Sequence, residues 1–464
     1  MKGFLKPPGV GLQYDRGSIL IWNLPGGDAE ILKPVEGVVW DARVGAHRCH
    51  GLHYRAVVRA LTQAGIALED QAREYPELPA GPRRLPDLFE HQRLALEAWE
   101  RGKRGVVELP TGAGKTMVAL QAMAQVGRGS LVLVPTLDLA AQWCREIESV
   151  LGVPSGMIGG GEHEVLPVTV STYASALRKG EHFGNRFCLA VFDECHHLAA
   201  EGNSQIAEML IAPYRLGLSA TVERPDDRHL LLDRLIGPLV FRRGIHELSG
   251  AVLSEYRVEV CHAALSEEEQ RMYREARAEY LAFARANDVL PTSGRDWQRF
   301  IWAAARSEAG RQALKAFQTQ RQISFAAEGK FVVLGELLER HRGERVLVFT
   351  NDNLTAYEIS RRFLIPLITH QTKLAERKQI MERFRDNRWP FLVTSRVLNE
   401  GVDVPECGVA VILSGSASVR EHVQRLGRIL RRREGKQAVL YEVLTRFTGE
   451  EGVSQRRRQH DAYR

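Results

Sequence analysis

The sequence predicts an α/β protein with two parallel-sheet lobes in tandem, preceded by a small mixed N-terminal domain and separated by a helical insertion. Short apolar runs without polar alternation occur in two separate sets along the chain. Stretches with helical spacing lie between the runs of each set, so strand and helix follow in turn. A glycine-poor stretch rich in Ala, Glu, Arg and Gln separates the two sets.

The first set of apolar runs predicts strands that are buried on both faces of a parallel sheet. These runs are Val106–Leu109, Leu131–Val134, Val168–Val170, Leu189–Phe192 and Leu216–Leu218. Helical spacing at Lys115–Ala124 and Leu137–Leu151 places helices between them.

The second set predicts a second lobe of the same kind. Its runs are Val346–Phe349, Pro366–Ile368, Phe391–Val393, Val409–Leu413 and Ala438–Val443. Between the lobes, Leu265–Glu339 has the composition of helices. Before the first lobe we expect a strand at Ser18–Trp22, a helix at Tyr54–Gln63 and a proline-bearing linker at Glu74–Pro86.

Length and composition agree with a soluble protein of several domains. The chain has 464 residues, 44% hydrophobic and 26% charged, which is too long for one core. No apolar run approaches a membrane span, so we expect a cytoplasmic protein. The six cysteines form no CxxC pair and are predicted to be reduced thiols.

Charge alone does not identify a partner, because the formal net charge is only +6. The excess is concentrated at the end of the chain. From Arg420 to Arg464 there are twelve Lys/Arg and six Asp/Glu. A solvated tail and a nucleic-acid contact both remain open for Arg456, Arg457 and Arg458.

A phosphate-binding loop is predicted directly after the first buried run. The segment PTGAGKT contains Thr111, Gly112, Ala113, Gly114, Lys115 and Thr116. Its glycines let backbone N–H groups wrap around phosphate oxygens, and the following helix N-terminus attracts negative charge. We expect Lys115 to reach the β and γ phosphates of ATP and Thr116 to bind Mg²⁺. Leu109 stands where the strict motif has glycine, so the loop alone is a moderate signal.

Two acids follow another buried run, in VFDECHH. Asp193 and Glu194 should lie at the carboxyl edge of the sheet, where open α/β folds bind ligands. Asp193 is expected to hold Mg²⁺ and Glu194 to accept a proton from the attacking water. Two acids can also simply end a strand, but the phosphate-binding loop makes that interpretation weak.

The segment QRLGRILR in the second lobe places Arg428 and Arg431 on one helical face. Phosphoryl transfer needs positive charge near the γ-phosphate, and arginines commonly supply it. Taken alone, this segment would be interpreted as a basic surface helix.

These motifs, in this order, resemble the superfamily 2 helicases, and most closely the XPB group of DNA repair helicases. Gln92 in LFEHQ resembles the adenine-reading glutamine. PTGAGKT resembles motif I, Val132–Trp143 motif Ia, DECH motif II, and Ser219-Ala220-Thr221 motif III. In the second lobe VLVFTND resembles motif IV, Val393–Pro405 motif V, and QRLGRILR motif VI. The stretch Trp40–Tyr54 resembles part of that group's damage-recognition domain.

The resemblance implies four regions and further site residues. The regions are a damage-recognition-like domain at 1–80, a RecA-like ATP-binding lobe at 81–250, a thumb-like insertion and hinge at 251–340, and a second RecA-like lobe at 341–464. Gly401, Asp403 and Gln424 are expected to contribute to ATP binding. His196, Ser219 and Thr221 are expected to couple the ATP site to movement.

Expected DNA contacts are mainly to phosphates and independent of sequence. The resemblance points to Thr136 and Thr172 in the first lobe, although both could be ordinary helix caps or turn residues. It also points to Arg224 and Asp226. There the XPB group carries an Arg-Glu-Asp element implicated in strand separation, whereas this chain reads Arg224-Pro225-Asp226.

One local cluster, His47, Cys49, His50 and His53, could be imagined as metal ligands, but no second ligand pair follows, so we do not expect zinc. The leading hypothesis is an ATP- and Mg²⁺-dependent DNA helicase acting in repair or transcription, with the 3′–5′ direction that the resemblance implies. Its rival is a double-strand translocase that does not separate strands, which the missing acid and Pro225 favour slightly. A third hypothesis is a non-enzymatic DNA-binding scaffold that recruits a nuclease. We expect a monomer, since one chain carries both lobes, with single-stranded or forked DNA as ligand and a structure-specific nuclease as candidate partner.

Overall fold

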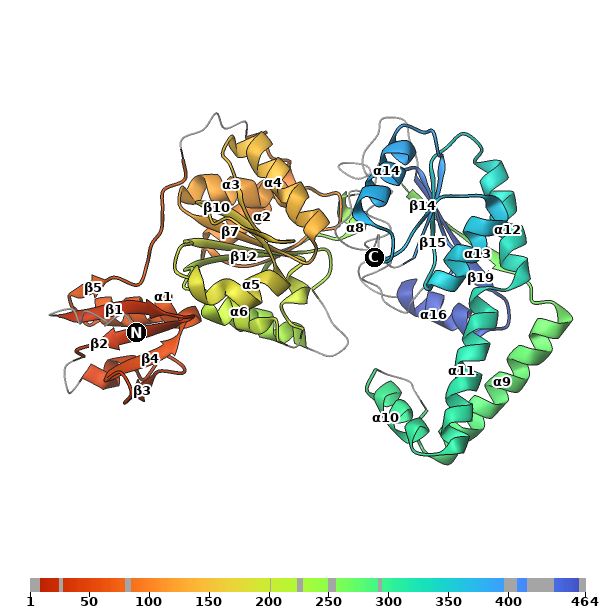
Figure 1. The fold of residues 1–464 in the computed structure, drawn as a ribbon, viewed down its shortest axis with the longest axis horizontal. Helices are drawn as coiled ribbons and strands as arrows, with labels where there is room; N and C mark the ends of the chain where they lie inside the picture. Colours follow the sequence, from red (N-terminus) through yellow and green to blue (C-terminus); the bar gives the residue numbers. More distant parts are fainter. Residues whose placement is uncertain are drawn as a thin grey trace. The chain divides into compact units, whose positions relative to one another are not determined.

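A computed structural model describes residues 9–24, 28–79, 85–200, 202–222, 228–248, 256–290, 294–395, 407–414 and 438–458. The chain divides into two compact units, one made of residues 1–109 and 114–243 and the other of residues 110–113 and 244–464 (Figure 1). The described residues form three sheets.

The N-terminal sheet has the order β3-β4-β2-β1-β5 and is mostly antiparallel. Its strands are β1 Val10–Asp15, β2 Ser18–Trp22, β3 Val39–Asp41, β4 Ala46–His50 and β5 Leu68–Asp70. Helix α1, Tyr54–Gln63, buries Val57 and Leu61 against this sheet. The expected strand at residues 18–22 and helix at residues 54–63 are both present.

The second sheet forms the first lobe and has the order β13-β6-β12-β11-β7-β10-β8-β9. Its strands are β6 Arg104–Glu108, β7 Ser130–Val134, β8 Gly156–Gly159, β9 Glu162–His163, β10 Val168–Thr172, β11 Leu189–Asp193, β12 Tyr214–Ser219 and β13 Leu239–Arg242. The pairs from β13 to β8 are parallel. All five apolar runs of the first set are therefore strands of one sheet.

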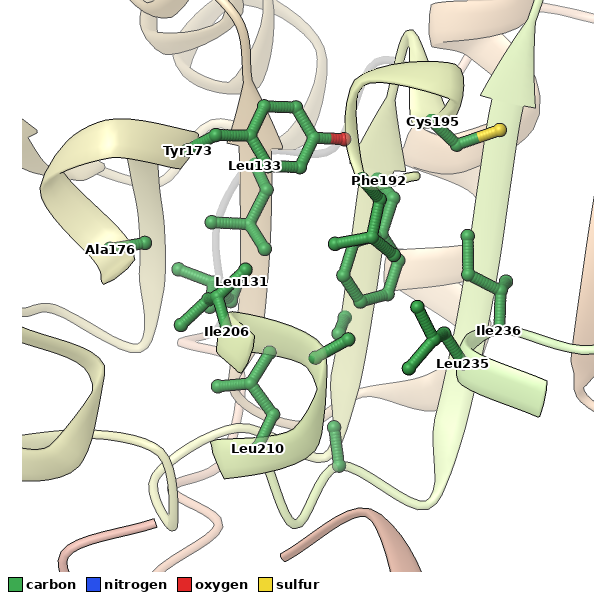
Figure 2. Packing of buried hydrophobic residues seen from close by; sticks show 14 of the residues in the cluster. Leu131, Leu133, Tyr173, Ala176, Phe192, Cys195, Ile206, Leu210, Leu235 and Ile236 are labelled. Atoms are coloured by element: carbon green, nitrogen blue, oxygen red, sulfur yellow. The ribbon is translucent and has the colours of Figure 1, made fainter. Parts of the chain in front are cut away.

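Helices cover both faces of this sheet, as a doubly wound fold requires. They are α2 Glu90–Glu100, α3 Lys115–Val126, α4 Leu137–Leu151, α5 Tyr173–Lys179, α6 Ser204–Met209 and α7 Leu231–Leu235. Figure 2 shows one face, where Leu131 and Phe192 of the sheet pack against Ile206 of α6 and Leu235 of α7. Strands in such a sheet carry no polar alternation because neither face meets water.

The short edge strands β8, β9 and β13 were not anticipated from the sequence. β8 reads GMIG and β9 has two exposed residues, so neither carries a recognisable apolar run. β13 is only partly buried, although it pairs with β6 beside the predicted phosphate-binding loop. Position in the sheet, and not local composition, makes these segments strands.

The second unit is built on a sheet of order β14-β19-β18-β15-β17-β16, all parallel. Its strands are β14 Tyr256–Ala263, β15 Val346–Phe349, β16 Leu367–Ile368, β17 Phe391–Thr394, β18 Val409–Ile412 and β19 Ala438–Thr445. Its helices are α8 Ile245–Leu248, α9 Glu267–Ala286, α10 Gly294–Ala305, α11 Glu308–Phe325, α12 Glu328–Arg340, α13 Asn353–Phe363, α14 Leu374–Arg385 and α16 Gly449–Arg458.

The segment between the lobes is helical, as its composition indicates. Helices α9, α10 and α11 pack on one another around an aromatic core that includes Tyr280, Phe300 and Phe317 (Figure 1). A capping box begins α9, because Ser266 accepts from the Glu269 N–H and Glu269 accepts from the Ser266 N–H. Two elements of residues 251–340 nevertheless form part of the second lobe, one as a strand of its sheet and one as a helix packed on it. β14 pairs with β19 along its whole length, and α12 supplies core residues against that sheet.

All six cysteines are free thiols. Among the helices of the described ranges, none has the length and apolar character needed to cross a membrane.

Candidate active site

The phosphate-binding loop joins the end of β6 to the start of α3. Gly112 and Gly114 have φ values of 88° and 78°, in the left-handed region that favours glycine. A Cβ at Gly114 would lie 2.1 Å from Gln92 Nε2, so it would displace the Gln92 amide from the loop. The N-terminus of a helix presents backbone N–H groups that suit phosphate oxygens, and α3 begins directly after this loop. Lys115 and Thr116 open that helix, and the Lys115 ammonium donates to the Leu109 carbonyl at 2.9 Å.

Gln92 is buried at the start of α2 and is tied to this loop. Its Oε1 accepts from the Phe89 N–H at 3.0 Å, and its Nε2 lies 3.4 Å from the Gly114 carbonyl. The side chain expected to read adenine therefore also holds α2 against the glycine that begins α3.

Asp193 and Glu194 lie at the carboxyl end of β11. Trp143 Nε1 donates to Asp193 Oδ2 at 2.8 Å, and the Glu194 N–H donates to Oδ1 at 3.0 Å. Tyr173 donates its hydroxyl to the Asp193 carbonyl at 2.9 Å. Glu194 has a φ of 47°, an uncommon value for a residue with a side chain, which marks the sharp turn out of the strand. The Asp193 carboxylate is thus held from both the helix side and the backbone side.

Burial, as the larger cause, and the neighbouring charge of Glu194 together raise the pKa of Asp193 to about 6. The hydrogen bond from Trp143 and the charge of Lys115 act in the opposite direction. A cation that approaches a buried carboxylate with such a raised pKa stabilises its ionised form.

His196, Ser219 and Thr221 form a connected hydrogen-bonded group beside the two acids. His196 Nδ1 lies 3.2 Å from Ser219 Oγ, and that hydroxyl donates to the Thr221 carbonyl at 2.8 Å. His196 Nδ1 also lies 3.5 Å from Glu194 Oε2. The group therefore links the acidic pair to the segment that follows β12.

Strand order explains why these residues meet. β12 lies between β6 and β11, with Ser219 opposite Glu108 and Leu218 opposite Asp193. The carboxyl ends of the three parallel strands consequently lie side by side at one edge of the sheet.

Two buried polar atoms at this edge, Thr111 Oγ1 and Glu194 Oε2, have no hydrogen-bond partner among the described residues. Buried polar atoms are rarely left unsatisfied, so both oxygens are suited to contact a ligand. Carboxylate and hydroxyl oxygens suit Mg²⁺, which prefers few protein ligands together with substrate phosphates. No group of three or more His, Cys, Asp or Glu side chains that could enclose a metal exists within the described ranges. The residues present fit Mg²⁺ brought with a nucleotide.

The two threonines expected to contact DNA both cap helices. Thr136 Oγ1 accepts from the Leu139 N–H at 3.3 Å at the start of α4. Thr172 is buried, and its hydroxyl accepts from the Ser175 N–H at 3.2 Å and donates to Ser175 Oγ at 3.0 Å. The capping alternative accounts for both side chains, while a contact to phosphate stays a prediction.

The remaining expected site residues lie outside the described residues. They are Arg224 and Asp226 after β12, and Gly401, Asp403, Gln424, Arg428 and Arg431 of the second lobe. Their roles stay predictions.

The roles of three residues of the site were not anticipated from the sequence. Trp143 and Tyr173 hold the strand end that carries Asp193. Glu108, at the end of β6, accepts from the Val222 N–H at 3.0 Å and from Arg242 Nε at 2.8 Å, and so fixes the segment after Thr221. The only available signal was that a buried tryptophan N–H needs an acceptor.

Family models match three parts of the chain. Residues 12–72 match the xeroderma pigmentosum group B helicase damage recognition domain, residues 85–224 the type III restriction enzyme res subunit, and residues 329–433 the helicase conserved C-terminal domain.

Curated relatives agree with these matches. The "DNA 3'-5' translocase XPB2" of Sulfurisphaera tokodaii is 37% identical over 423 residues, covering 91% of this chain and 96% of that protein. The "DNA 3'-5' helicase XPB" of Mycobacterium tuberculosis is 32% identical over 372 residues, covering 77% of this chain and 61% of that protein.

Solved structures support the fold. The Pyrococcus furiosus Hef helicase domain has a TM-score of 0.52 at 18% identity, covering 81% of this chain and 99% of that chain. Dbp5 of S. cerevisiae, bound to RNA and ADP BeF3, has a TM-score of 0.56 at 15% identity, covering 81% of this chain and 87% of that chain.

Proposed function

This chain belongs to the XPB-like DNA helicases of superfamily 2, and we propose that it is a DNA motor driven by ATP hydrolysis at the carboxyl edge of its first lobe. The observation that carries the proposal is the meeting of the phosphate-binding loop with Asp193 and Glu194 at one edge of the sheet. There the buried Thr111 Oγ1 and Glu194 Oε2 have no hydrogen-bond partner among the described residues. We further propose the division into regions 1–80, 81–250, 251–340 and 341–464, which the family matches at 12–72, 85–224 and 329–433 support.

In this proposal each residue of the first lobe has one task in phosphoryl transfer. Lys115 leaves the Leu109 carbonyl and binds the β and γ phosphates, and Gln92 binds adenine. Thr116 and Asp193 would hold Mg²⁺, which would supply charge neutralisation at the phosphate oxygens. Glu194 orients the attacking water and accepts its proton.

Coupling to DNA is proposed to run through His196, Ser219 and Thr221. His196 Nδ1 lies 3.5 Å from Glu194 Oε2 and 3.2 Å from Ser219 Oγ, and the Ser219 hydroxyl donates to the Thr221 carbonyl. A change at the acid can therefore alter the segment after β12. A motor needs such a link, because ATP turnover produces movement only if the affinity for DNA differs between states. For the second lobe we keep Gly401, Asp403, Gln424, Arg428 and Arg431 as proposed ATP-site residues on the strength of their motifs.

Whether the motor separates strands is the finer part of the proposal. We favour a 3′–5′ helicase by family membership, whereas Pro225 in place of the acid favours a double-strand translocase. Gel assays on forked duplexes and triplexes distinguish the two. ATP-dependent displacement of the duplex strand supports the helicase, and displacement of the triplex strand alone supports the translocase.

Lys115→Ala tests the site itself. We expect it to abolish DNA-stimulated ATP hydrolysis while DNA binding remains measurable, because the lysine serves phosphate and not the DNA. Retained hydrolysis in this variant would contradict the proposed site.

A further inference from the structure

A second feature of the first unit is a basic groove at the junction of the N-terminal domain and the first lobe. It has a volume of about 1010 Å³. Five cationic side chains line it: Arg55, Arg59, Arg73, Lys103 and Arg128. Three come from the N-terminal domain and two from the lobe, so neither part forms the groove alone.

The junction that forms this groove is firmly packed. Tyr75 donates its hydroxyl to the Ile211 carbonyl at 3.1 Å, and Arg55 Nη1 donates to the Gly102 carbonyl at 3.0 Å. Leu52 lies in the core of the lobe, and Ile211 lies in the core of the N-terminal domain. The groove is therefore preformed, which lowers the entropic cost of binding.

The groove is also distinct from the nucleotide site. Lys103 immediately precedes β6 and Tyr214 begins β12, so these residues lie at the amino ends of the parallel strands. The phosphate-binding loop lies at the carboxyl ends. Strands of five or six residues at about 3.3 Å per residue separate the two edges by roughly 17–20 Å.

Its charge is not compensated within its own lining, which contains no carboxylate. Arg73 and Arg128 form ion pairs with Asp70 and Glu77, at 3.2 and 3.1 Å, outside the groove lining. Arg59 is exposed, and Lys103 lies over the Tyr214 ring, 4.9 Å from its centroid. Among the described residues no carboxylate lies within ion-pair distance of Arg59 or Lys103. Clustered cations of this kind concentrate a polyanion near the surface.

We propose that the basic groove binds the phosphate backbone of DNA, as a contact additional to the motor's own path. The proposal rests on the DNA-directed activity of this family. An acidic protein segment is the other polyanion that fits by charge, but such partners usually add apolar anchors. Within the described part of the chain, the aliphatic side chains of the groove are only Val58, Val126 and Pro213. Its three tyrosines already have contacts within the protein, because Tyr54 and Tyr75 donate to Asp70 and to the Ile211 carbonyl, and Lys103 lies over the Tyr214 ring. Arginine and lysine without base-reading partners predict binding that is independent of sequence.

The test is the double variant Arg59→Gln/Lys103→Gln, with Arg178→Gln/Arg342→Gln as a control of equal charge at exposed positions that do not line the groove. Affinity for a labelled duplex is measured by fluorescence anisotropy over a salt series. Each phosphate contact contributes about 0.9 to the slope of log K against log salt, so two lost contacts lower the slope by up to about 1.8. At about 0.1 M salt this corresponds to a loss of up to roughly sixtyfold in affinity.

Several outcomes would overturn the proposal. The double variant could keep the affinity and salt slope of the control, which means that the groove carries no DNA contact. It could instead lose binding of poly-L-glutamate while DNA binding is unchanged, which assigns the groove to an acidic peptide. ATP hydrolysis without DNA should equal that of wild type in both variants. Because the readout is equilibrium binding, failure here is distinguishable from failure of the ATPase proposal.

Discussion

Replacing Trp143 with phenylalanine removes one hydrogen-bond donor from the carboxylate of Asp193 and keeps most of the aromatic packing. The lost bond is 2.8 Å long and buried. A hydrogen bond to a charged group contributes about 1.5–3 kcal/mol. One pKa unit corresponds to about 1.36 kcal/mol, so the loss is equivalent to about one to two units.

The direction of the shift follows from the chemistry. Burial already raises the pKa of Asp193 to about 6, and the Trp143 N–H opposes that rise by stabilising the ionised form. Without it the pKa rises further, and Asp193 is protonated at a higher pH. Mg²⁺ binding needs the ionised carboxylate. As the pH is lowered, kcat/KM for DNA-stimulated ATP hydrolysis should therefore begin to fall at a higher pH in Trp143→Phe than in wild type.

Trp99→Phe is the matched control for this experiment. Trp99 is also buried, and its Nε1 donates at 2.9 Å to the Arg215 carbonyl and not to a carboxylate. It should lose stability by about 0.5–1.5 kcal/mol without moving the acidic limb of the pH profile. The reasoning is refuted if the acidic limb of Trp143→Phe superimposes on that of Trp99→Phe.

Two further predictions concern the first and second lobes. Gln92→Ala should raise KM for ATP about tenfold and reduce the preference for ATP over GTP, because the Gln92 amide is proposed to bind adenine. Steady-state kinetics with both nucleotides measure this effect. An unchanged ATP:GTP preference would contradict the proposed role of Gln92. Lys330→Met should destabilise the second unit by about 3–5 kcal/mol, because Glu450 would lose the buried ammonium that lies 2.7 Å from its Oε2. Urea unfolding measures the loss in the free energy of unfolding, and the control Lys378→Met, at an exposed lysine, should change it by close to zero. If the double variant Lys330→Met/Glu450→Gln recovers no stability relative to Lys330→Met, the unpaired burial of Glu450 is not the cause.

The sequence predicted much of the architecture because buried parallel strands and capped helices are local patterns. The apolar run Leu189–Phe192 predicted a buried strand, and the PTGAGKT loop predicted the turn from a strand into a helix; both are present. Strand β14 escaped this reasoning. Its sequence YRVEVCHA is only partly buried, and pairing with β19, far along the chain, makes it part of the sheet.

Side-chain partners across the site could not be predicted in the same way. The 3.2 Å contact between His196 and Ser219 exists because β12 lies beside β11, and strand order is not encoded in residue spacing. Likewise, Trp143 was expected only as part of a motif, and its role as a donor to Asp193 depends on how α4 packs over the sheet. Tertiary arrangement decides such contacts.

The central claim is that ATP hydrolysis at the edge of the first lobe is coupled to DNA. It is tested most directly by measuring ATP hydrolysis of the wild-type protein and of Glu194→Gln with single-stranded DNA, duplex DNA and RNA. The account predicts stimulation of the wild type by DNA above RNA, and loss of that stimulated rate in Glu194→Gln with DNA binding retained. A wild-type protein that no nucleic acid stimulates would contradict the account and leave a DNA-binding scaffold as the better description.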